Sequence, residues 1–149
     1  MERLVCRALA ARETFPLCLV RTCDIRLAYF SFRNEEAIPL IRQALRLNPF
    51  FPQLYNQFGI AYRETGRYEE GIAAVKKALQ LAPNYFLVIT TLATLYSYAG
   101  REDEARAAAT EVQRIDPNFS LTRYAKELPW KEGPRRDRIL DALRKAGLK

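Results

Sequence analysis

Between residues 52 and 85, apolar and small residues recur at the spacing of one helix face in two successive runs. In the first run, positions i, i+3, i+4 and i+7 are Tyr55, Phe58, Gly59 and Tyr62. The second run contains Ile72, Val75, Ala78 and Leu79. Because each run places its apolar residues on one side, the segment predicts two amphipathic helices, each with a face to bury.

The residues between the two runs indicate where the first helix ends and the second begins. Gly66 tolerates the left-handed conformation that ends a helix, and Arg67 brings a cation to the negative end of the first helix. The pair Glu69–Glu70 places negative charge in the first turn of the second helix. Small residues at Gly59 and Gly71 allow the two helices to approach closely as an antiparallel pair.

This two-helix pattern repeats with a step of 34 residues. The clearest members of the series are the prolines Pro49, Pro83 and Pro117. Arginines, small residues and aromatic residues follow the same step at Arg33, Arg67, Arg101; Ala37, Gly71, Ala105; and Phe51, Tyr85, Phe119. A single unit of this size cannot bury its own apolar face, so the units are expected to stack and share one core.

The order of small, aromatic and proline positions resembles the tetratricopeptide repeat family over residues 18–119. The resemblance implies an all-α solenoid of antiparallel helix pairs that forms a right-handed superhelix and ends in a C-terminal capping helix. We expect residues 1–149 to form one domain. Its parts would be an N-terminal helix (1–17), a degenerate repeat (18–51), two regular repeats (52–85 and 86–119) and capping helices (120–149).

The first repeat departs from the pattern. Its first helix has Arg21 and Asp24 where large apolar residues are expected, and Phe32 replaces the turn glycine. Its second helix keeps an apolar set, Ala37, Ile41, Ala44 and Leu47. Pro39 lies inside that helix and removes one backbone donor, which predicts a bend or a late start of the helix.

The resemblance also implies a binding surface, because in this family the first helix of each repeat lines the concave side of the solenoid. The positions carried over from the two regular repeats are Gln53, Asn56, Gln57, Ile60, Arg63, Glu64, Leu87, Thr90, Thr94, Ser97 and Tyr98. The degenerate repeat adds Thr22, Arg26 and Tyr29. Asn and Gln side chains can pair with the backbone of an extended peptide, but each of these residues can equally be ordinary helix surface.

Some members of the family clamp a C-terminal carboxylate with a set of lysines and asparagines. Thr22, Arg26 and Gln57 stand at the corresponding places here, so the clamp is not reproduced. A protein or peptide partner is still expected, while a chaperone-tail ligand is disfavoured.

The net charge of +7 is concentrated at the two ends of the chain. Residues 123–149 contain nine basic and four acidic residues, and residues 1–33 contain six and three. The basic residues of the tail include Arg135, Arg136, Arg138, Arg144, Lys145 and Lys149. Because acidic and apolar residues alternate with them, the tail favours the solvated face of a capping helix over a nucleic-acid site, which stays as a weaker alternative.

Candidate catalytic and metal-binding chemistry is sparse. The chain has no histidine, and Cys6, Cys18 and Cys23 show no C-x-x-C spacing. The phased carboxylates are explained by their place at helix starts, and no Gly-rich phosphate loop is present. The pattern therefore predicts a protein that is not an enzyme and that needs no metal or cofactor.

The longest uninterrupted apolar stretch, residues 15–20, is far shorter than a membrane span of about 20 residues. Charged residues also interrupt the beginning of the chain too often for a secretory signal. We expect a cytoplasmic protein with no membrane segment.

The end of the chain carries a second resemblance. The segments 116–121, 128–131 and 139–148 look like the tail that closes the tetratricopeptide region of bacterial class III adenylate/guanylate cyclases. The chain carries no cyclase domain, so no nucleotide-binding or metal-binding residue is transferred. Three hypotheses remain: a scaffold that binds a peptide or partner helix, a regulatory or self-associating module of a nucleotide cyclase, and a basic tail that binds nucleic acid.

Overall fold

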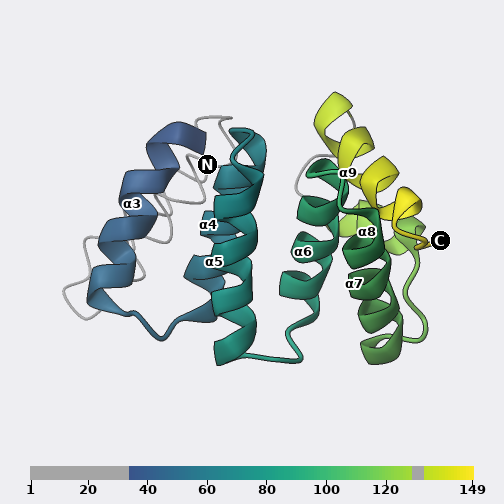
Figure 1. Cartoon of the computed structure of the whole chain (residues 1–149), viewed down its shortest axis with the longest axis horizontal. Helices are drawn as coiled ribbons and strands as arrows, with labels where there is room; N and C mark the ends of the chain where they lie inside the picture. Colours follow the sequence, from purple (N-terminus) through teal and green to yellow (C-terminus); the bar gives the residue numbers. More distant parts are fainter. Residues whose placement is uncertain (1–33, 129–132) are drawn as a thin grey trace.

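A computed structural model of the protein describes residues 34–128 and 133–149, and within them the regular structure is entirely helical (Figure 1). The helices are α3 (Asn34–Leu47), α4 (Pro52–Glu64), α5 (Tyr68–Leu81), α6 (Phe86–Tyr98), α7 (Glu102–Ile115), α8 (Leu121–Glu127) and α9 (Pro134–Lys145). The predicted N-terminal helix and the first helix of the degenerate repeat lie outside the described residues.

The two regular repeats form two helical hairpins that stack side by side. Helix α4 pairs with α5 and α6 pairs with α7, while α5 packs against α6 and α4 also touches α6. Helix α3 precedes the first hairpin and packs against α4 (Figure 1). This order puts α4 and α6 in one layer and α3, α5 and α7 in the other, which is the predicted all-α solenoid of antiparallel pairs.

Glycines decide how closely α4 and α5 approach. A Cβ atom on Gly59 of α4 would lie 2.2 Å from Cγ2 of Val75 in α5, and one on Gly71 of α5 would lie 3.1 Å from the backbone oxygen of Gly59 in α4. The first distance is too short for two carbon atoms, and the second is closer than an ordinary van der Waals contact. The predicted role of Gly59 and Gly71 in close helix packing is confirmed.

The turns inside the two hairpins have the same backbone geometry. Gly66 has a φ of 77°, and the N–H of Arg67 donates to the carbonyl of Tyr62 at 2.9 Å. Thirty-four residues later Gly100 has a φ of 73°, and the equivalent N–H donates to the equivalent carbonyl, again at 2.9 Å. In both turns the glycine ends the helix by satisfying carbonyls of its last turn.

The larger core cluster runs from α5 of the first hairpin through the second hairpin into the C-terminal helices. Its members include Val75, Val88, Leu95, Val112, Leu121, Ile139, Leu143 and Leu148. A smaller cluster joins α3 to α4 through Ala37, Ile38, Ile41, Ala44, Leu54, Ala61 and Tyr62. The predicted apolar faces are therefore buried between neighbouring helices, as stacking requires.

Two expectations for α3 differ from the structure. The helix begins at Asn34 and continues through Pro39, so the late start is wrong, while the alternative of a bend at Pro39 stays a prediction. Leu47, predicted as a core residue, is 56% exposed at the end of the helix. The equivalent Leu81 and Ile115 are partly buried. The physical reason is that, among the described helices, α3 packs against α4, whereas α5 is held between α4 and α6.

The last two helices close the solenoid, as predicted. Helix α8 ends at Glu127, shortly before Pro129, and its first backbone N–H, from Leu121, donates to the carbonyl of Lys149 at 2.9 Å. Helix α9 ends at Lys145, and Gly147, two residues later, has a φ of 103°. Helix α9 packs against both α6 and α8.

Candidate partner-binding surface

The predicted groove positions on α4 differ in their access to solvent. Gln53 is exposed, and Gln57 and Ile60 are half-buried. Asn56 is only 7% exposed and Arg63 only 5%. The Oδ1 atom of Asn56 accepts no hydrogen bond within the described structure. Only the outer part of this helix face is therefore open to a partner in the structure as it stands.

The predicted groove positions on α6 are covered more completely. Thr90 and Thr94 are fully buried, and their hydroxyl groups donate to carbonyls of their own helix, those of Phe86 at 2.9 Å and Thr91 at 2.7 Å. A threonine whose hydroxyl bonds back to the preceding turn offers little to a ligand. Ser97 is half-buried, and Leu87, near the start of the helix, is 43% exposed. The three predicted groove residues of the degenerate repeat, Thr22, Arg26 and Tyr29, lie outside the described residues.

Helix α9 is what covers the inner face of α6. The hydroxyl of Ser97 donates to the backbone carbonyl of Ala142 in α9 at 2.9 Å. The buried residues of α9, with Ile139 and Leu143 among them, belong to the same apolar cluster as the core residues of α6. The concave side of the second hairpin is thus occupied by a helix of the same chain.

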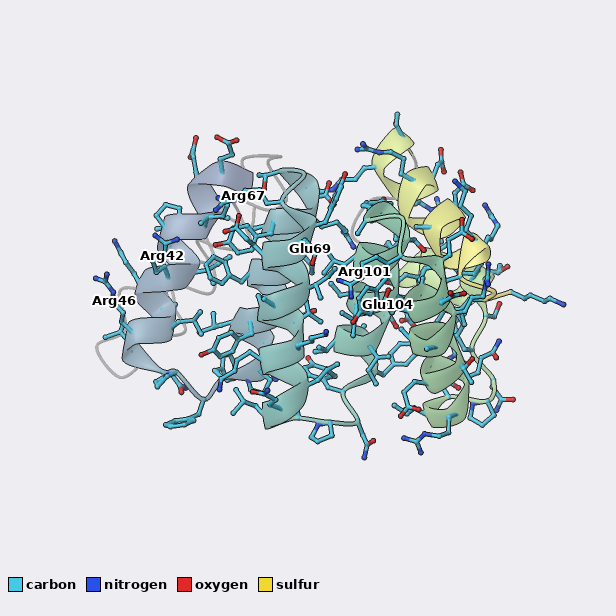
Figure 2. All side chains as sticks on the ribbon, in the orientation of Figure 1. Arg42, Arg46, Arg67, Glu69, Arg101 and Glu104 are labelled. Carbon is cyan, nitrogen blue, oxygen red and sulfur yellow. The ribbon has the colours of Figure 1, made fainter. Side chains whose placement is uncertain are left out.

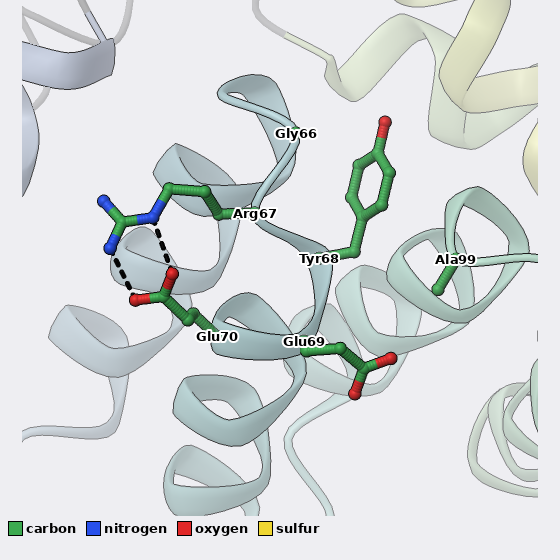
Figure 3. Close-up of a pocket in the computed structure, with 6 residues that line it drawn as sticks. All are labelled: Gly66, Arg67, Tyr68, Glu69, Glu70 and Ala99. Carbon is green, nitrogen blue, oxygen red and sulfur yellow. Dashed lines mark hydrogen bonds and ion pairs between the residues drawn. The ribbon is translucent and has the colours of Figure 1, made fainter.

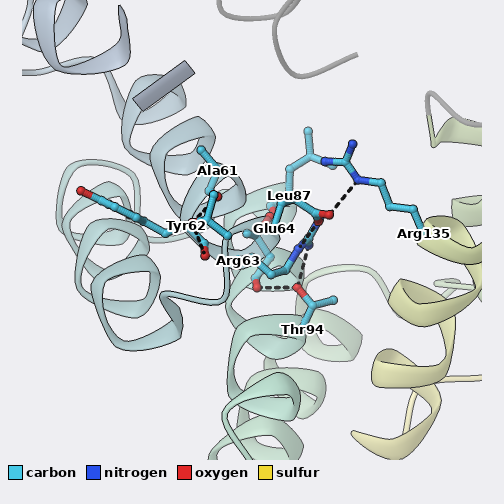
Figure 4. Close-up of polar contacts among 9 residues, drawn as sticks. Ala61, Tyr62, Arg63, Glu64, Leu87, Thr94 and Arg135 are labelled. Carbon is cyan, nitrogen blue, oxygen red and sulfur yellow. Dashed lines mark hydrogen bonds and ion pairs between the residues drawn. The ribbon is translucent and has the colours of Figure 1, made fainter. Parts of the chain in front are cut away.

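A buried ionic cluster joins α9 to the first hairpin as well (Figure 4). Oε1 of Glu64 accepts hydrogen bonds from Nε and Nη2 of Arg63, at 3.0 and 2.9 Å. Oε2 of Glu64 forms an ion pair with Nε of Arg135 at 2.9 Å, although that N–H is not aligned for a hydrogen bond. Nη1 of Arg63 also donates to the hydroxyl of Thr94 at 3.0 Å. The cluster therefore connects α4, α6 and α9.

The position of Arg135 corrects the interpretation of the basic tail. Arg135 is 5% exposed and turned into the protein, whereas Arg138, Arg144 and Lys145 on the same helix are exposed as predicted. Arg135 stands 34 residues after Arg101, so the repeat period would have singled it out within the tail. The physical reason for its burial is the carboxylate of Glu64, which lies 2.9 Å from Nε of Arg135 and offers it a buried partner.

Tyr98 lies at the edge of this cluster. Its ring packs edge-on against Tyr68 with centroids 5.9 Å apart, and the guanidinium carbon of Arg63 lies 6.0 Å from its centroid. Burial raises the pKa of the Tyr98 hydroxyl above its ordinary value, although the charges of Arg63 and Arg138 act against that shift. Tyr98 is consequently a neutral, half-buried residue between α9 and the turn edge of the solenoid.

A ladder of ion pairs follows the turns on the outside of the molecule (Figure 2). Arg67 pairs with Glu70 through two hydrogen bonds, and Arg101 pairs with Glu104 in the same way. Arg101 also reaches Glu69 of the preceding repeat at 3.1 Å. These hydrogen bonds lower the pKa of Glu70 and of Glu104 below the ordinary range. The phased charges of the sequence therefore connect repeats to each other.

A hollow of about 340 Å³ lies between the two turns (Figure 3). Its lining consists of residues 66–70 and Ala99. Figure 3 shows Arg67 paired with Glu70 at one side of the hollow, and Glu69 on the other side pairs with Arg101. The charged groups of this hollow are thus engaged in the ladder.

The described residues contain no group of three or more histidine, cysteine, aspartate or glutamate side chains placed to hold a metal ion. The three cysteines of the sequence lie outside the described part of the chain. None of the described helices is long and apolar enough to cross a membrane.

The comparisons with known proteins agree with this geometry. Residues 51–118 match the family model described as tetratricopeptide repeat. The described residues have the fold of a tetratricopeptide-repeat solenoid, although the family match itself covers less than half of the chain. The matched segment covers the two tetratricopeptide hairpins, α4 to α7, and leaves α3, α8 and α9 outside. No curated protein matches the chain significantly in sequence.

Solved structures of tetratricopeptide domains, and of MamA, share the fold. The first such domain of Spaghetti (RPAP3), bound to an HSP90 peptide, is 16% identical with a TM-score of 0.69 over 87% of this chain and 89% of that chain. The Sgt2 domain from Aspergillus fumigatus is 18% identical with a TM-score of 0.69, over 89% and 78%. MamA of AMB-1 is 27% identical with a TM-score of 0.62, over 77% and 66%.

Proposed function

We propose that the protein is a non-catalytic interaction scaffold whose concave side, formed by α4 and α6, binds a peptide or a helix of a partner protein. The observation that carries this proposal is that the concave side already holds a helix, α9, through apolar contacts, a backbone hydrogen bond and a buried ion pair. An amphipathic helix seated in a groove is a recurring mode of peptide recognition.

The structural neighbours support the same use of the fold. Two tetratricopeptide domains of RPAP3 are described in complex with an HSP90 peptide and with an HSP70 peptide. The ligand of the present protein should differ in chemistry, because Gln57 is a neutral residue and Thr90 and Thr94 are buried. We therefore expect a partner that is not selected by a carboxylate clamp.

The open part of the groove can be tested by affinity capture from a lysate of the source organism. The test variant carries Gln53→Ala, Gln57→Ala and Ile60→Ala, which change accessible groove positions without removing a buried charge. Its matched control carries Lys77→Ala, Gln80→Ala and Gln113→Ala on exposed positions of α5 and α7. Asn56 and Arg63 are unsuitable for this test because they are buried, and their loss would lower stability.

We expect a protein that is retained by the wild type and by the control variant and lost by the groove variant, with circular dichroism showing all three folded. Equal retention by all three chains would contradict a binding role for the α4 side of the groove.

The alternative of a regulatory or self-associating module of a nucleotide cyclase rests on the sequence of the tail alone. In the structure the same tail forms the helix that covers α6, which gives it a role inside this domain. We therefore prefer the scaffold.

A further inference from the structure

The contacts of α9 show what kind of segment the concave side accepts. Its buried residues Arg135, Ile139 and Leu143 are spaced four apart, and Ala142 and Ala146 lie on the same face. Such spacing places one polar head and an apolar stripe along a single side of a helix. The opposite side carries Arg138, Asp141 and the last basic residues, all of them exposed.

Two polar contacts between α9 and the groove differ in what they require of the bound helix. One contact involves a backbone group, and the other involves a particular side chain. Ser97 binds the backbone carbonyl of Ala142, a group that every helix possesses. Glu64 binds the side chain of Arg135, and a guanidinium is needed to match that buried carboxylate. Arginine at this position is therefore the feature by which the groove would distinguish one helix from another.

The charges left behind after removal of α9 remain compatible with a folded groove. Arg63 stays paired with Oε1 of Glu64 and hydrogen-bonded to Thr94, so neither buried charge loses its only partner. Oε2 of Glu64, which faces Arg135 in the structure, becomes available to another cation. The site thus has a vacant acceptor of defined chemistry once α9 departs.

We propose that α9 is an internal ligand of the α4–α6 groove, and that a partner protein binds there by presenting an amphipathic helix in its place. The partner helix would carry an arginine for Glu64 and aliphatic residues four and eight positions later for α6. This inference rests on the proposed scaffold function and adds its partner chemistry and its regulation.

Because α9 belongs to the same chain as the groove, it should weaken the apparent affinity of the groove for a partner helix. A segment of the same chain competes at an effective concentration of the order of millimolar. If the open groove is populated at about 1%, the apparent affinity for a partner helix falls about 100-fold. A partner must therefore bind tightly, or α9 must be loosened first.

The test uses a fluorescent peptide of residues 133–149 and the full-length chain, with binding measured by fluorescence anisotropy. Three chains are compared: wild type, Arg135→Ala, and Arg138→Ala as the matched control, which removes the same charge from the exposed side of the same helix. A second peptide with Arg135→Ala tests the specific contact.

We expect the peptide to bind the Arg135→Ala chain about tenfold more tightly than the wild type or the control, because its own α9 competes less well. The peptide that lacks the arginine should lose about tenfold in affinity for that chain. Equal binding by all three chains, or no binding by a folded Arg135→Ala chain, would overturn the proposal.

Hydrogen exchange of the wild type decides the matter if the Arg135→Ala chain does not fold. Amides of α9 should exchange faster than those of α6, because α9 opens while the hairpins remain folded. Equal protection of the two helices would mean that α9 leaves the groove only on global unfolding, and this result would contradict the proposal.

The two proposals fail in different ways. In one outcome the peptide binds all three chains equally, while a protein captured from the lysate is still lost by the variant at Gln53, Gln57 and Ile60. That outcome would refute α9 as an internal ligand and leave the scaffold intact. In the other outcome the peptide binds the Arg135→Ala chain more tightly, as expected, but no chain captures a protein from the lysate. That outcome would leave α9 as an internal ligand and refute the scaffold.

Discussion

The two regular repeats are alike at their turns and different on their concave faces. Each turn has a glycine with positive φ followed by an arginine that pairs with a glutamate three residues later. On the concave side, Arg63 and Glu64 of α4 stand where α6 has the uncharged Ser97 and Tyr98. The α4 side keeps an exposed edge, and the α6 side lies under α9.

This difference shows which parts of a repeat are set by its neighbours and which by its ligand. Turn residues and packing residues must serve the same helix contacts in every unit, so they recur with the period. Concave residues contact whatever lies in the groove, and here that is a helix that belongs to no repeat. The charged pair on α4 has a further partner in Arg135 of α9.

The largest effect should come from the charge that is unique to the α4 side. Glu64→Gln removes the buried carboxylate that Arg63 and Arg135 share, and should cost about 3–5 kcal/mol of unfolding free energy. Urea unfolding measures this cost. As a control, Glu69→Gln removes an exposed carboxylate and should cost at most about 1 kcal/mol. Similar costs for the two variants would show that the cluster is solvated.

The second difference between the hairpins lies in the residues at the contact between their two helices. Gly59 and Val75 of the first hairpin correspond to Ala93 and Ala109 of the second. Gly59→Ala should destabilise by about 1–3 kcal/mol, because its Cβ would lie 2.2 Å from Val75, even though alanine is ordinarily the better helix former.

Adding Val75→Ala to Gly59→Ala should recover part of that loss, since the double variant copies the second hairpin. Thermal or urea unfolding of the two single variants and the double variant measures the coupling. A Gly59→Ala chain that is more stable than the wild type would contradict the close approach of α4 and α5.

The ion pairs at the turns, which both repeats share, should make a smaller, pH-dependent contribution to stability. Because hydrogen bonds from Arg67 and Arg101 lower the folded-state pKa of Glu70 and Glu104, these carboxylates stabilise the fold above their unfolded pKa of about 4.3. That contribution is lost as the pH falls through the lowered folded pKa. We expect the urea midpoint to decline below about pH 5.

The double variant Glu70→Gln, Glu104→Gln should show a flatter decline of the urea midpoint over the same pH range. High salt should flatten the wild-type profile as well, because the pairs are exposed. An unchanged profile in the double variant would assign the acid sensitivity to other carboxylates.

The smallest effect is expected on the solvent side of α9. Arg138→Ala should change the unfolding free energy by no more than about 0.5 kcal/mol, because Arg138 is exposed. Arg135→Ala, three residues away on the same helix, should cost more in the same urea experiment. Equal costs would show that the burial of Arg135 contributes nothing to the docking of α9.

Much of the fold could be predicted because it depends on local rules that the period displays. Gly66 and Gly100 marked the hairpin turns, the acidic pairs marked the starts of α5 and α7, and Gly147 marked the end of α9. The burial of Leu47 was wrongly predicted, because the repeat pattern assumes a neighbour on both sides of every helix, while among the described helices α3 packs against α4.

The candidate binding surface was predicted less well from the sequence than the fold. Its residues were placed on the concave side by resemblance, and whether a partner uses them stays a prediction. Asn56, Arg63, Thr90 and Thr94 were expected to face a groove open to a ligand, but they are buried in the structure. A polar residue beside a packing position can be surface in one solenoid and interior in another, depending on what crosses the groove.

The sequence by itself determined the helices, their turns and the stacking of the two regular hairpins, because spacing, glycines and helix-end charges act over a few residues and repeat every 34. Only the tertiary structure decided that α9 lies across the inner face of α6 and that Arg135 is its buried cation. That contact joins residues 71 positions apart, Glu64 and Arg135, and no local rule of spacing reports a pairing over such a distance.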